Sequence, residues 1–172
     1  MRGTLETIVG AMFAGKTSEL LKRILWAKHQ EKKILVIKPS IDNRYSERLI
    51  ITHNDLSHEC YAMKDWKQTN MDYQLVRKNY DIVFLDEVQF MDTKQTIDNV
   101  EKMLNSGIDV VCAGLDQDSR GKPWETSSFL LGLSDKITKI YGFCNVCGFE
   151  ATKTYRKVKG GERTHVGAAN IY

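Results

Sequence analysis

The sequence predicts an α/β protein in which a parallel sheet is flanked by helices. A β-branched apolar run at 5–9 (LETIV) leads into a glycine-bearing turn, and helical spacing of apolar residues then continues to about His29. The next apolar run, 33–37 (KILVI), completes a strand, a helix and a strand, which is the parallel βαβ unit. Two further runs, 81–85 and 109–115, have the unbroken apolar character of strands buried on both faces.

The other elements follow from weaker patterns along the chain. Apolar spacing indicates helices at 71–78, 93–105 and 127–134. Alternating or β-branched stretches allow strands at 49–52, 59–62 and 136–141. Turn-forming composition predicts loops at 42–46 and 116–123. The strands and helices therefore alternate through most of the chain, as a parallel sheet requires.

Composition limits the class of protein. The 172 residues suffice for one domain of ordinary size and a small appended module, with 42% hydrophobic and 27% charged residues. Apolar runs stay well below the roughly 20 residues that span a bilayer, and the first residues do not resemble a signal peptide. The 25 basic and 22 acidic side chains are interleaved, for a net charge of +3. We therefore expect a cytoplasmic protein without a membrane or nucleic-acid partner.

The turn after the first strand matches the phosphate-binding pattern G-x-x-x-x-G-K-[ST]. Its backbone N–H groups can surround a phosphate, and the N-terminus of the following helix adds a favourable dipole. In this pattern Lys16 reaches the β- and γ-phosphates of a nucleotide and Thr17 coordinates Mg²⁺. The sequence thus predicts a P-loop NTPase-like sheet with a site for nucleotide phosphates. The residues of the loop are Gly10, Ala11, Met12, Phe13, Ala14, Gly15, Lys16 and Thr17.

Two carboxylates follow the buried strand at 81–85. Asp86 comes directly after the strand, where open α/β sheets hold their ligands, and it offers the oxygen ligand that Mg²⁺ prefers. Glu87 lies one residue further on and can accept a proton from an attacking hydroxyl group or water. The pair alone is a weak signal, because solvated carboxylates are common at strand ends, but the phosphate loop strengthens it.

The composition changes near residue 142. Residues 1–141 are expected to form the phosphate-binding α/β domain, and 142–172 a small β-rich lobe with a glycine-rich loop whose flexibility suits a lid. Within this lobe Cys144 and Cys147 have the spacing with which two thiolates grip one zinc ion. Structural zinc requires four ligands, so the pair is half of a site, and a CxxC pair can also be redox-active.

Six segments, in this order, resemble the type II thymidine kinase family of animals, bacteria, poxviruses and phages. They span nearly the whole chain, and their ordered combination is highly specific. The GAMFAGKTSEL segment resembles that family's phosphate loop, in which a Met-Phe pair is distinctive. The segments are GAMFAGKTSEL, KPSIDNRYS, DEVQF, GLDQDSRGKPW, CNVCG and HVGAANIY.

The resemblance implies transfer of the ATP γ-phosphate to the 5′-hydroxyl of thymidine or deoxyuridine, with Glu87 as the general base. It implies ATP and Mg²⁺ as cofactors, and a structural Zn²⁺ whose other two ligands follow the position of Tyr172. It also implies a homotetramer and feedback binding of dTTP. By position, the ATP site includes Asp86, Glu87, Val88 and Gln89, with Asp42 and Arg44 near the phosphates. The residues around the nucleoside are Met12, Phe90, Leu115 and Thr154, with a lasso-like loop that includes Val166, Gly167, Ala168 and Tyr172.

One position departs from the family pattern. Where the family commonly has an aromatic residue in the LDxDFRG segment, this chain has Ser119. A stacked ring contributes about 1 to 3 kcal/mol to base binding, so its absence weakens or reshapes the pocket unless Trp124 or Tyr155 compensates.

Two other functions stay open on the residues alone. One is an ATP-hydrolysing switch in which Glu87 polarises water and the CxxC lobe binds a partner. The other is a non-catalytic, zinc-dependent interaction module, in which Lys16 is dispensable.

Overall fold

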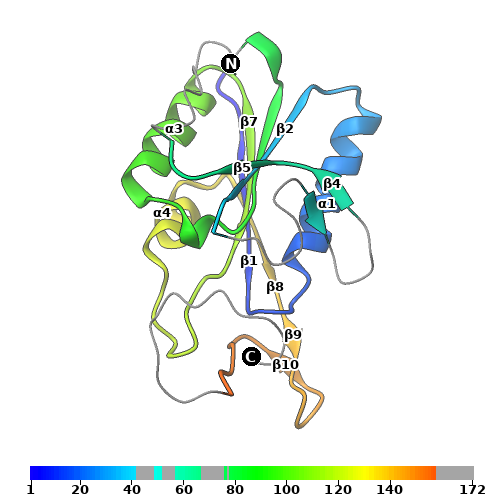
Figure 1. Cartoon of the computed structure of the whole chain (residues 1–172), viewed down its shortest axis with the longest axis vertical. Coiled ribbons are helices and arrows are strands. Elements are labelled where there is room, and N and C mark those ends of the chain that lie inside the picture. The colour runs from blue at the N-terminus through cyan, green and yellow to red at the C-terminus, as the bar shows by residue number, and fades with distance from the viewer. Residues whose placement is uncertain (42–48, 52–56, 67–75, 77, 158–172) are drawn as a thin grey trace.

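The computed structural model describes residues 1–41, 49–51, 57–66, 76 and 78–157. In this part of the chain a six-stranded sheet has the order β5-β2-β6-β7-β1-β8, and every neighbouring pair is parallel (Figure 1). The parallel α/β class predicted from the sequence is confirmed. The strands are β1 (Leu5–Gly10), β2 (Ile34–Pro39), β5 (Tyr61–Met63), β6 (Ile82–Leu85), β7 (Asp109–Gly114) and β8 (Lys136–Ile140).

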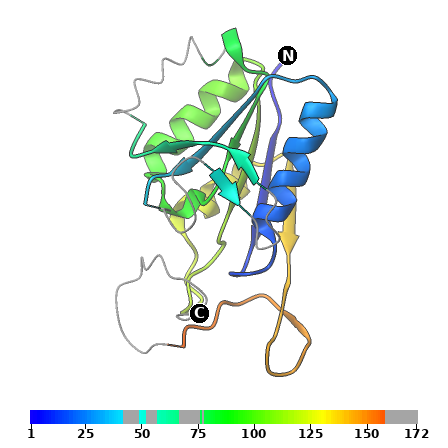
Figure 2. The ribbon, with the colours of Figure 1, turned by 45° about the vertical axis from the view of Figure 1, so that its right-hand side comes forward.

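Helices cover both faces of this sheet. The helix α1 (Lys16–His29) lies on one face, while α3 (Thr93–Asn105) and α4 (Glu125–Leu133) lie on the other (Figures 1 and 2). A 3-10 turn, η1 (Val88–Phe90), follows β6. Among the described residues, none of the helices has the length and apolar character needed to cross a membrane.

Each face of the sheet has its own apolar core, and alternation along the strands divides the side chains between them. In β6, Val83 and Leu85 pack toward α3, whereas Phe84 packs toward α1. In β7, Cys112 is fully buried in the α3 core, and burial raises the pKa of its thiol. Because these strands are apolar on both faces, shifting their pairing by one residue would still bury apolar side chains, and only differences in side-chain size would oppose the shift. The helices packed on the two faces therefore help to fix the register.

Two small antiparallel sheets accompany the main one. The strands β3 (Leu49–Ile51) and β4 (Ser57–Glu59) pair with each other, as do β9 (Gly142–Phe143) and β10 (Glu150–Ala151). The β9-β10 hairpin lies beyond the end of β8 (Figure 1).

Most predicted elements are confirmed, with three differences. The prediction of a single strand at 59–62 is wrong, because strand pairing is interrupted at Cys60. This residue separates β4 from β5, which belong to different sheets. The last helix begins at Glu125 rather than at 127, and η1 was not predicted. The predicted loop at 42–46 and most of the predicted helix at 71–78 lie outside the described residues.

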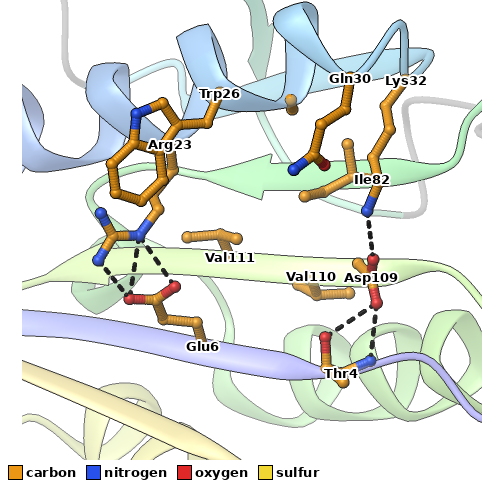
Figure 3. A pocket seen from close by; sticks show the side chains of 11 residues that line it. Thr4, Glu6, Arg23, Trp26, Gln30, Lys32, Ile82, Asp109, Val110 and Val111 are labelled. Atoms are coloured by element: carbon orange, nitrogen blue, oxygen red, sulfur yellow. Dashed lines mark hydrogen bonds and ion pairs between the residues drawn. The ribbon is translucent and has the colours of Figure 1, made fainter.

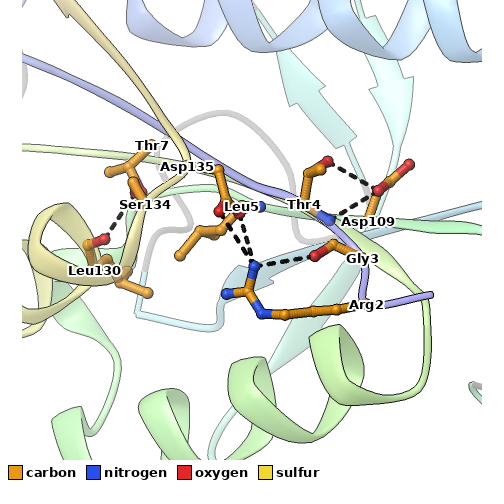
Figure 4. A network of polar contacts seen from close by, with 9 residues as sticks. All are labelled: Arg2, Gly3, Thr4, Leu5, Thr7, Asp109, Leu130, Ser134 and Asp135. Atoms are coloured by element: carbon orange, nitrogen blue, oxygen red, sulfur yellow. Dashed lines mark hydrogen bonds and ion pairs between the residues drawn. The ribbon is translucent and has the colours of Figure 1, made fainter.

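Polar contacts fasten the start of β1 to its neighbours. The Asp135 carboxylate accepts hydrogen bonds from the backbone N–H of Leu5 (2.8 Å) and from Arg2 (3.0 Å), and both bonds lower its pKa (Figure 4). Asp109 at the start of β7 accepts from both the N–H and the hydroxyl of Thr4, at 3.0 and 2.9 Å. These bonds fix the register of β1 between β7 and the edge strand β8.

A second charged group joins α1 to the sheet. Glu6 on β1 accepts a hydrogen bond from Arg23 on α1 at 2.9 Å (Figure 3). It also accepts one from the Thr138 hydroxyl at 2.8 Å, and the Lys136 ammonium group lies 3.1 Å away. Arg23 also lies over the Trp26 ring, 4.9 Å from its centroid. Burial raises the pKa of Glu6, but these donors outweigh it and lower that pKa to about 2.

The lowered pKa of Glu6 predicts acid-sensitive stability. A carboxyl group with a folded pKa below its unfolded value of 4.5 stabilises the fold above pH 4.5 and loses this contribution as the pH falls toward 2. We expect Glu6→Gln to lower the free energy of unfolding at pH 7 by about 2 to 3 kcal/mol, with the deficit vanishing near pH 2. Denaturant titrations of both proteins from pH 7 to 2 measure it. A deficit that stays constant with pH would contradict the assignment.

Candidate active site

The loop between β1 and α1 has the backbone conformation that its two glycines permit. At Gly10 an added Cβ would lie 2.4 Å from the carbonyl oxygen of Ile140 on β8, so the strands approach too closely for any side chain. Gly15 has φ +91°, in the left-handed region, and caps α1. Apart from Gly15 itself and its two neighbours in the chain, no atom of the described residues lies within 4 Å of where its Cβ would be. The loop therefore borders open space at the N-terminus of α1, which is the position of a bound phosphate in such loops.

The side chain of Lys16 is buried in this loop. Its Nζ donates a hydrogen bond to the carbonyl of Ala11 at 2.7 Å, and 9% of the residue is exposed. Phe13 has φ 62°, also left-handed, and its ring is half exposed. The backbone N–H of Met12 donates to the Thr154 hydroxyl at 3.0 Å. The structure thus brings the loop into contact with the segment after β10, which the sequence places 142 residues away.

The predicted carboxylates follow β6 at the same carboxyl edge of the sheet. Asp86 is 4% exposed, its backbone N–H donates to Ile37 of β2 at 2.9 Å, and its Oδ1 accepts from the N–H of Glu87 at 2.9 Å. Glu87 has φ 51° and ψ 41°, a left-handed conformation that is uncommon outside glycine. Strained residues of this kind gather at functional sites, so the conformation supports a role for Glu87.

The expected nucleoside residues lie near this edge on several elements. Phe90 ends η1, and its ring packs edge to face on Trp124, with centroids 6.0 Å apart. Leu115 follows β7 and is held at both ends, because its N–H donates to Gln89 at 2.9 Å and its carbonyl accepts from Ser127 at 2.6 Å. Trp124 and Tyr155 are the two aromatic residues that could replace the ring missing at Ser119. Trp124 contacts a predicted site residue, Phe90, whereas Tyr155 is 79% exposed.

The remaining predicted site residues belong to two other segments of the chain. Asp42 and Arg44, and the lasso-like loop, lie outside the described residues. The loop positions concerned are Val166, Gly167, Ala168 and Tyr172. Sequence reasoning also gave no role to Ser127 and Gly114, because their importance lies in contacts with residues far away in the chain.

Cys144 and Cys147, the pair predicted to be half of a zinc site, lie on one tight turn. The N–H of Gly148, whose φ is +73°, donates to the carbonyl of Cys144 at 2.8 Å and closes a tight turn. Backbone N–H groups of Cys147 and Val146 donate to the Cys144 sulfur and lower its pKa. These contacts favour the thiolate, the form that binds zinc. The described residues contain no cluster of three or more His, Cys, Asp or Glu side chains that could complete a metal site.

The close approach at Gly10 gives a direct test of the loop geometry. We expect Gly10→Ala to displace the loop from Ile140, lowering ATP affinity at least about tenfold and destabilising the protein by about 1 to 3 kcal/mol. Gly132→Ala is the matched control, because it lies inside α4 and its Cβ would meet no described atom within 4 Å other than those of its chain neighbours and its own helix backbone. Isothermal titration with ATP and thermal unfolding measure both effects. Equal ATP affinity in Gly10→Ala and wild type would contradict the packing described here.

The chain is similar to known proteins over its full length. The family model described as thymidine kinase matches residues 3–172. A curated protein named thymidine kinase, from Pseudothermotoga lettingae, is 37% identical over 173 aligned residues, covering 100% of this chain and 91% of that protein. Among solved structures, the replication initiator DnaA bound to AMPPCP and single-stranded DNA aligns with a TM-score of 0.48 and 16% identity, covering 80% of this chain and 40% of that one.

Proposed function

This chain belongs to the thymidine kinase family, and on that premise we propose that it transfers the ATP γ-phosphate to the 5′-hydroxyl of thymidine with Glu87 as general base. Phosphorylation of thymidine is the activity of the family. The observation that carries the proposed mechanism is the common position of two elements at the carboxyl edge of one parallel sheet: the loop after β1 and the Asp86-Glu87 pair after β6. Ligands of open α/β sheets bind at this edge.

We assign the binding of the ATP phosphates to the loop and to Lys16. The backbone N–H groups around Gly15 and the N-terminus of α1 provide donors for the β-phosphate. Lys16 already lies in the loop with its ammonium group on the Ala11 carbonyl, and it exchanges this partner for phosphate oxygens when ATP binds. Its positive charge then offsets the negative charge that develops during transfer.

Magnesium is the cation that fits the oxygen donors at this edge. Asp86, buried at the end of β6, and Thr17, in the first turn of α1, would hold it. When bound, this ion neutralises charge on the ATP phosphates. The hydrogen bond from the backbone N–H of Glu87 orients the Asp86 carboxylate whether or not the ion is present.

Glu87 acts on the acceptor alcohol. Its left-handed backbone ends the extended conformation of β6 and begins η1, and its carboxylate accepts a hydrogen bond from Gln89. We propose that its carboxylate accepts the proton of the thymidine 5′-hydroxyl as the oxygen attacks the γ-phosphate. Val88 and Gln89, expected at the ATP site from the family resemblance, form the buried turn behind it.

Met12, Phe90, Leu115 and Thr154 are proposed to surround the nucleoside. The hydrogen bond between Met12 and Thr154 joins the phosphate loop to the segment after β10, so two of these residues are already in contact. The edge-to-face contact of Trp124 with Phe90 supports Trp124 as the ring that compensates for Ser119. The lasso-like loop with Val166, Gly167, Ala168 and Tyr172 is proposed to cover the nucleoside and exclude water.

Further family properties are proposed for this chain. They are a cytoplasmic location, a homotetramer, feedback binding of dTTP, and a division into an ATP-binding domain (1–141) and a small lobe (142–172). The turn geometry at Cys144 and Cys147 supports a structural zinc site, with the remaining ligands supplied from outside the described residues. No interaction with nucleic acid or membrane is proposed.

Dependence of ATP turnover on nucleoside tests the activity. With Mg²⁺ present, we expect ADP to form in step with thymidine monophosphate, and only slowly when thymidine is omitted. Replacing thymidine with deoxyuridine shows how far the methyl group of the base contributes to the rate of phosphorylation. A purine deoxynucleoside serves as the negative control. ADP formation at the same rate with and without thymidine would favour an ATP-hydrolysing switch and contradict the proposal.

A further inference from the structure

We propose that Gln89 is a positioning residue that holds the Glu87 carboxylate and the Leu115 backbone in one fixed arrangement. Its Nε2 donates to Glu87 Oε2 at 2.5 Å, and its Oε1 accepts from the N–H of Leu115 at 2.9 Å. One amide group thus connects the proposed base, after β6, to the end of β7, where the nucleoside is expected. This inference rests on the proposed role of Glu87.

The chemistry of these partners fixes the orientation of the amide. A carboxylate can only accept hydrogen bonds and a backbone N–H can only donate, so the opposite orientation of Gln89 would oppose like groups at both ends. Gln89 is 5% exposed, and a buried amide that loses its partners costs about 1 to 3 kcal/mol. Both hydrogen bonds therefore require the same orientation of the Gln89 amide, and rotating the Glu87 carboxylate or the Leu115 backbone would break one of them.

The surrounding residues are shaped to keep this amide in place. At Gly114, the residue before Leu115, an added Cβ would lie 2.7 Å from Gln89 Oε1 and 2.7 Å from a methyl group of Val88. On the other side of Leu115, its carbonyl accepts from the buried hydroxyl of Ser127 in α4 at 2.6 Å. The chain of hydrogen bonds therefore runs from α4 through the end of β7 to Glu87.

A role in positioning differs from the direct ATP contact that the family resemblance implies for Gln89. Both polar atoms of its amide bond to other parts of the protein, and the side chain lies beneath the surface. Loss of Gln89 should therefore reduce the rate of transfer rather than the affinity for ATP. A displacement of the base by about 1 Å can cost about 100-fold in rate.

Steady-state kinetics of Gln89→Met test this distinction. We expect kcat to fall about 10- to 100-fold while KM for ATP stays within about twofold of wild type. Gln30→Met, at the C-terminal end of α1 and so at the opposite end of that helix from the phosphate loop, is the control for loss of a glutamine amide and should leave kcat unchanged. A raised KM for ATP with unchanged kcat would overturn the proposal and favour the ATP contact.

A double-mutant cycle with Glu87→Ala separates this inference from the proposed function. If Gln89 acts through Glu87, Gln89→Met should lower kcat less than about twofold further when Glu87 is already alanine. Wild-type kcat in Glu87→Ala would reject Glu87 as the base. A large loss in Glu87→Ala together with no loss in Gln89→Met would reject only the role of Gln89.

Gln89→Glu decides the question if the methionine variant is unstable. It keeps the size of the side chain but replaces the donor amide with a second carboxyl group facing Glu87. We expect kcat to fall at least about tenfold at neutral pH, with folding checked by near-UV circular dichroism and binding of ADP. A folded Gln89→Glu protein with wild-type kcat would overturn the proposal.

Discussion

Lys16→Met is expected to abolish most phosphoryl transfer, with kcat/KM for ATP lowered about 100- to 1,000-fold. Lys16 is the buried cation of the phosphate loop, with its ammonium group 2.7 Å from the Ala11 carbonyl. Methionine keeps much of the side-chain volume but cannot neutralise phosphate oxygens. Initial rates at varied ATP concentration, with thymidine saturating, measure the loss.

A matched variant on the same helix controls for loss of a lysine. Lys22 lies on α1 with its side chain 53% exposed and its ammonium group over the Trp26 ring. Lys22→Met should retain wild-type kcat/KM within about twofold, because exposed charges far from the phosphates are screened. Equal activity of Lys16→Met and Lys22→Met would contradict a role for the phosphate loop in the reaction.

Glu87→Gln is expected to lower kcat by about 100- to 10,000-fold while ATP still binds. The amide has nearly the same shape as the carboxylate and its oxygen can still accept from Gln89, so the turn at η1 should be preserved. It cannot accept the proton of the 5′-hydroxyl. Stopped-time assays of thymidine monophosphate give kcat, and titration with ATP gives the affinity.

An exposed glutamate on α3 provides the control for Glu87→Gln. Glu101→Gln removes the same charge at a position far from the sheet edge and should leave kcat unchanged. If Glu87→Gln lost ATP affinity instead of kcat, Glu87 would be part of the nucleotide site rather than the base. Unchanged kcat in both variants would reject any catalytic role.

The main sheet could be predicted because its signals are local. Each central strand is a continuous apolar run, and the glycine-lysine loop has a fixed spacing, so β1, α1 and β7 follow from short stretches of sequence. The β3 to β5 region could not be predicted in the same way. Its strands are three residues long, and the change from one sheet to another at Cys60 depends on tertiary pairing.

The same limit applies to the site. Glu87 and Lys16 were identified because each belongs to a motif, whereas the contact between Gln89 and Leu115 joins residues 26 apart in sequence. The left-handed backbone at Glu87 has no local signal either, since glutamate does not favour it. Motifs therefore indicated which side chains carry out the chemistry, and the fold was needed to show what holds them in place.

The distance from the Glu87 carboxylate to the acceptor oxygen tests the account most directly. It can be measured in a crystal structure of the enzyme with Mg²⁺ and an inhibitor in which adenosine and thymidine are joined through their 5′ positions by phosphates. We predict a Glu87 oxygen at about 2.6 to 3.2 Å from the thymidine 5′ oxygen, with phosphates on the N–H groups of the loop before α1. Phosphates bound away from that loop, or a different side chain at the 5′ oxygen, would contradict the account.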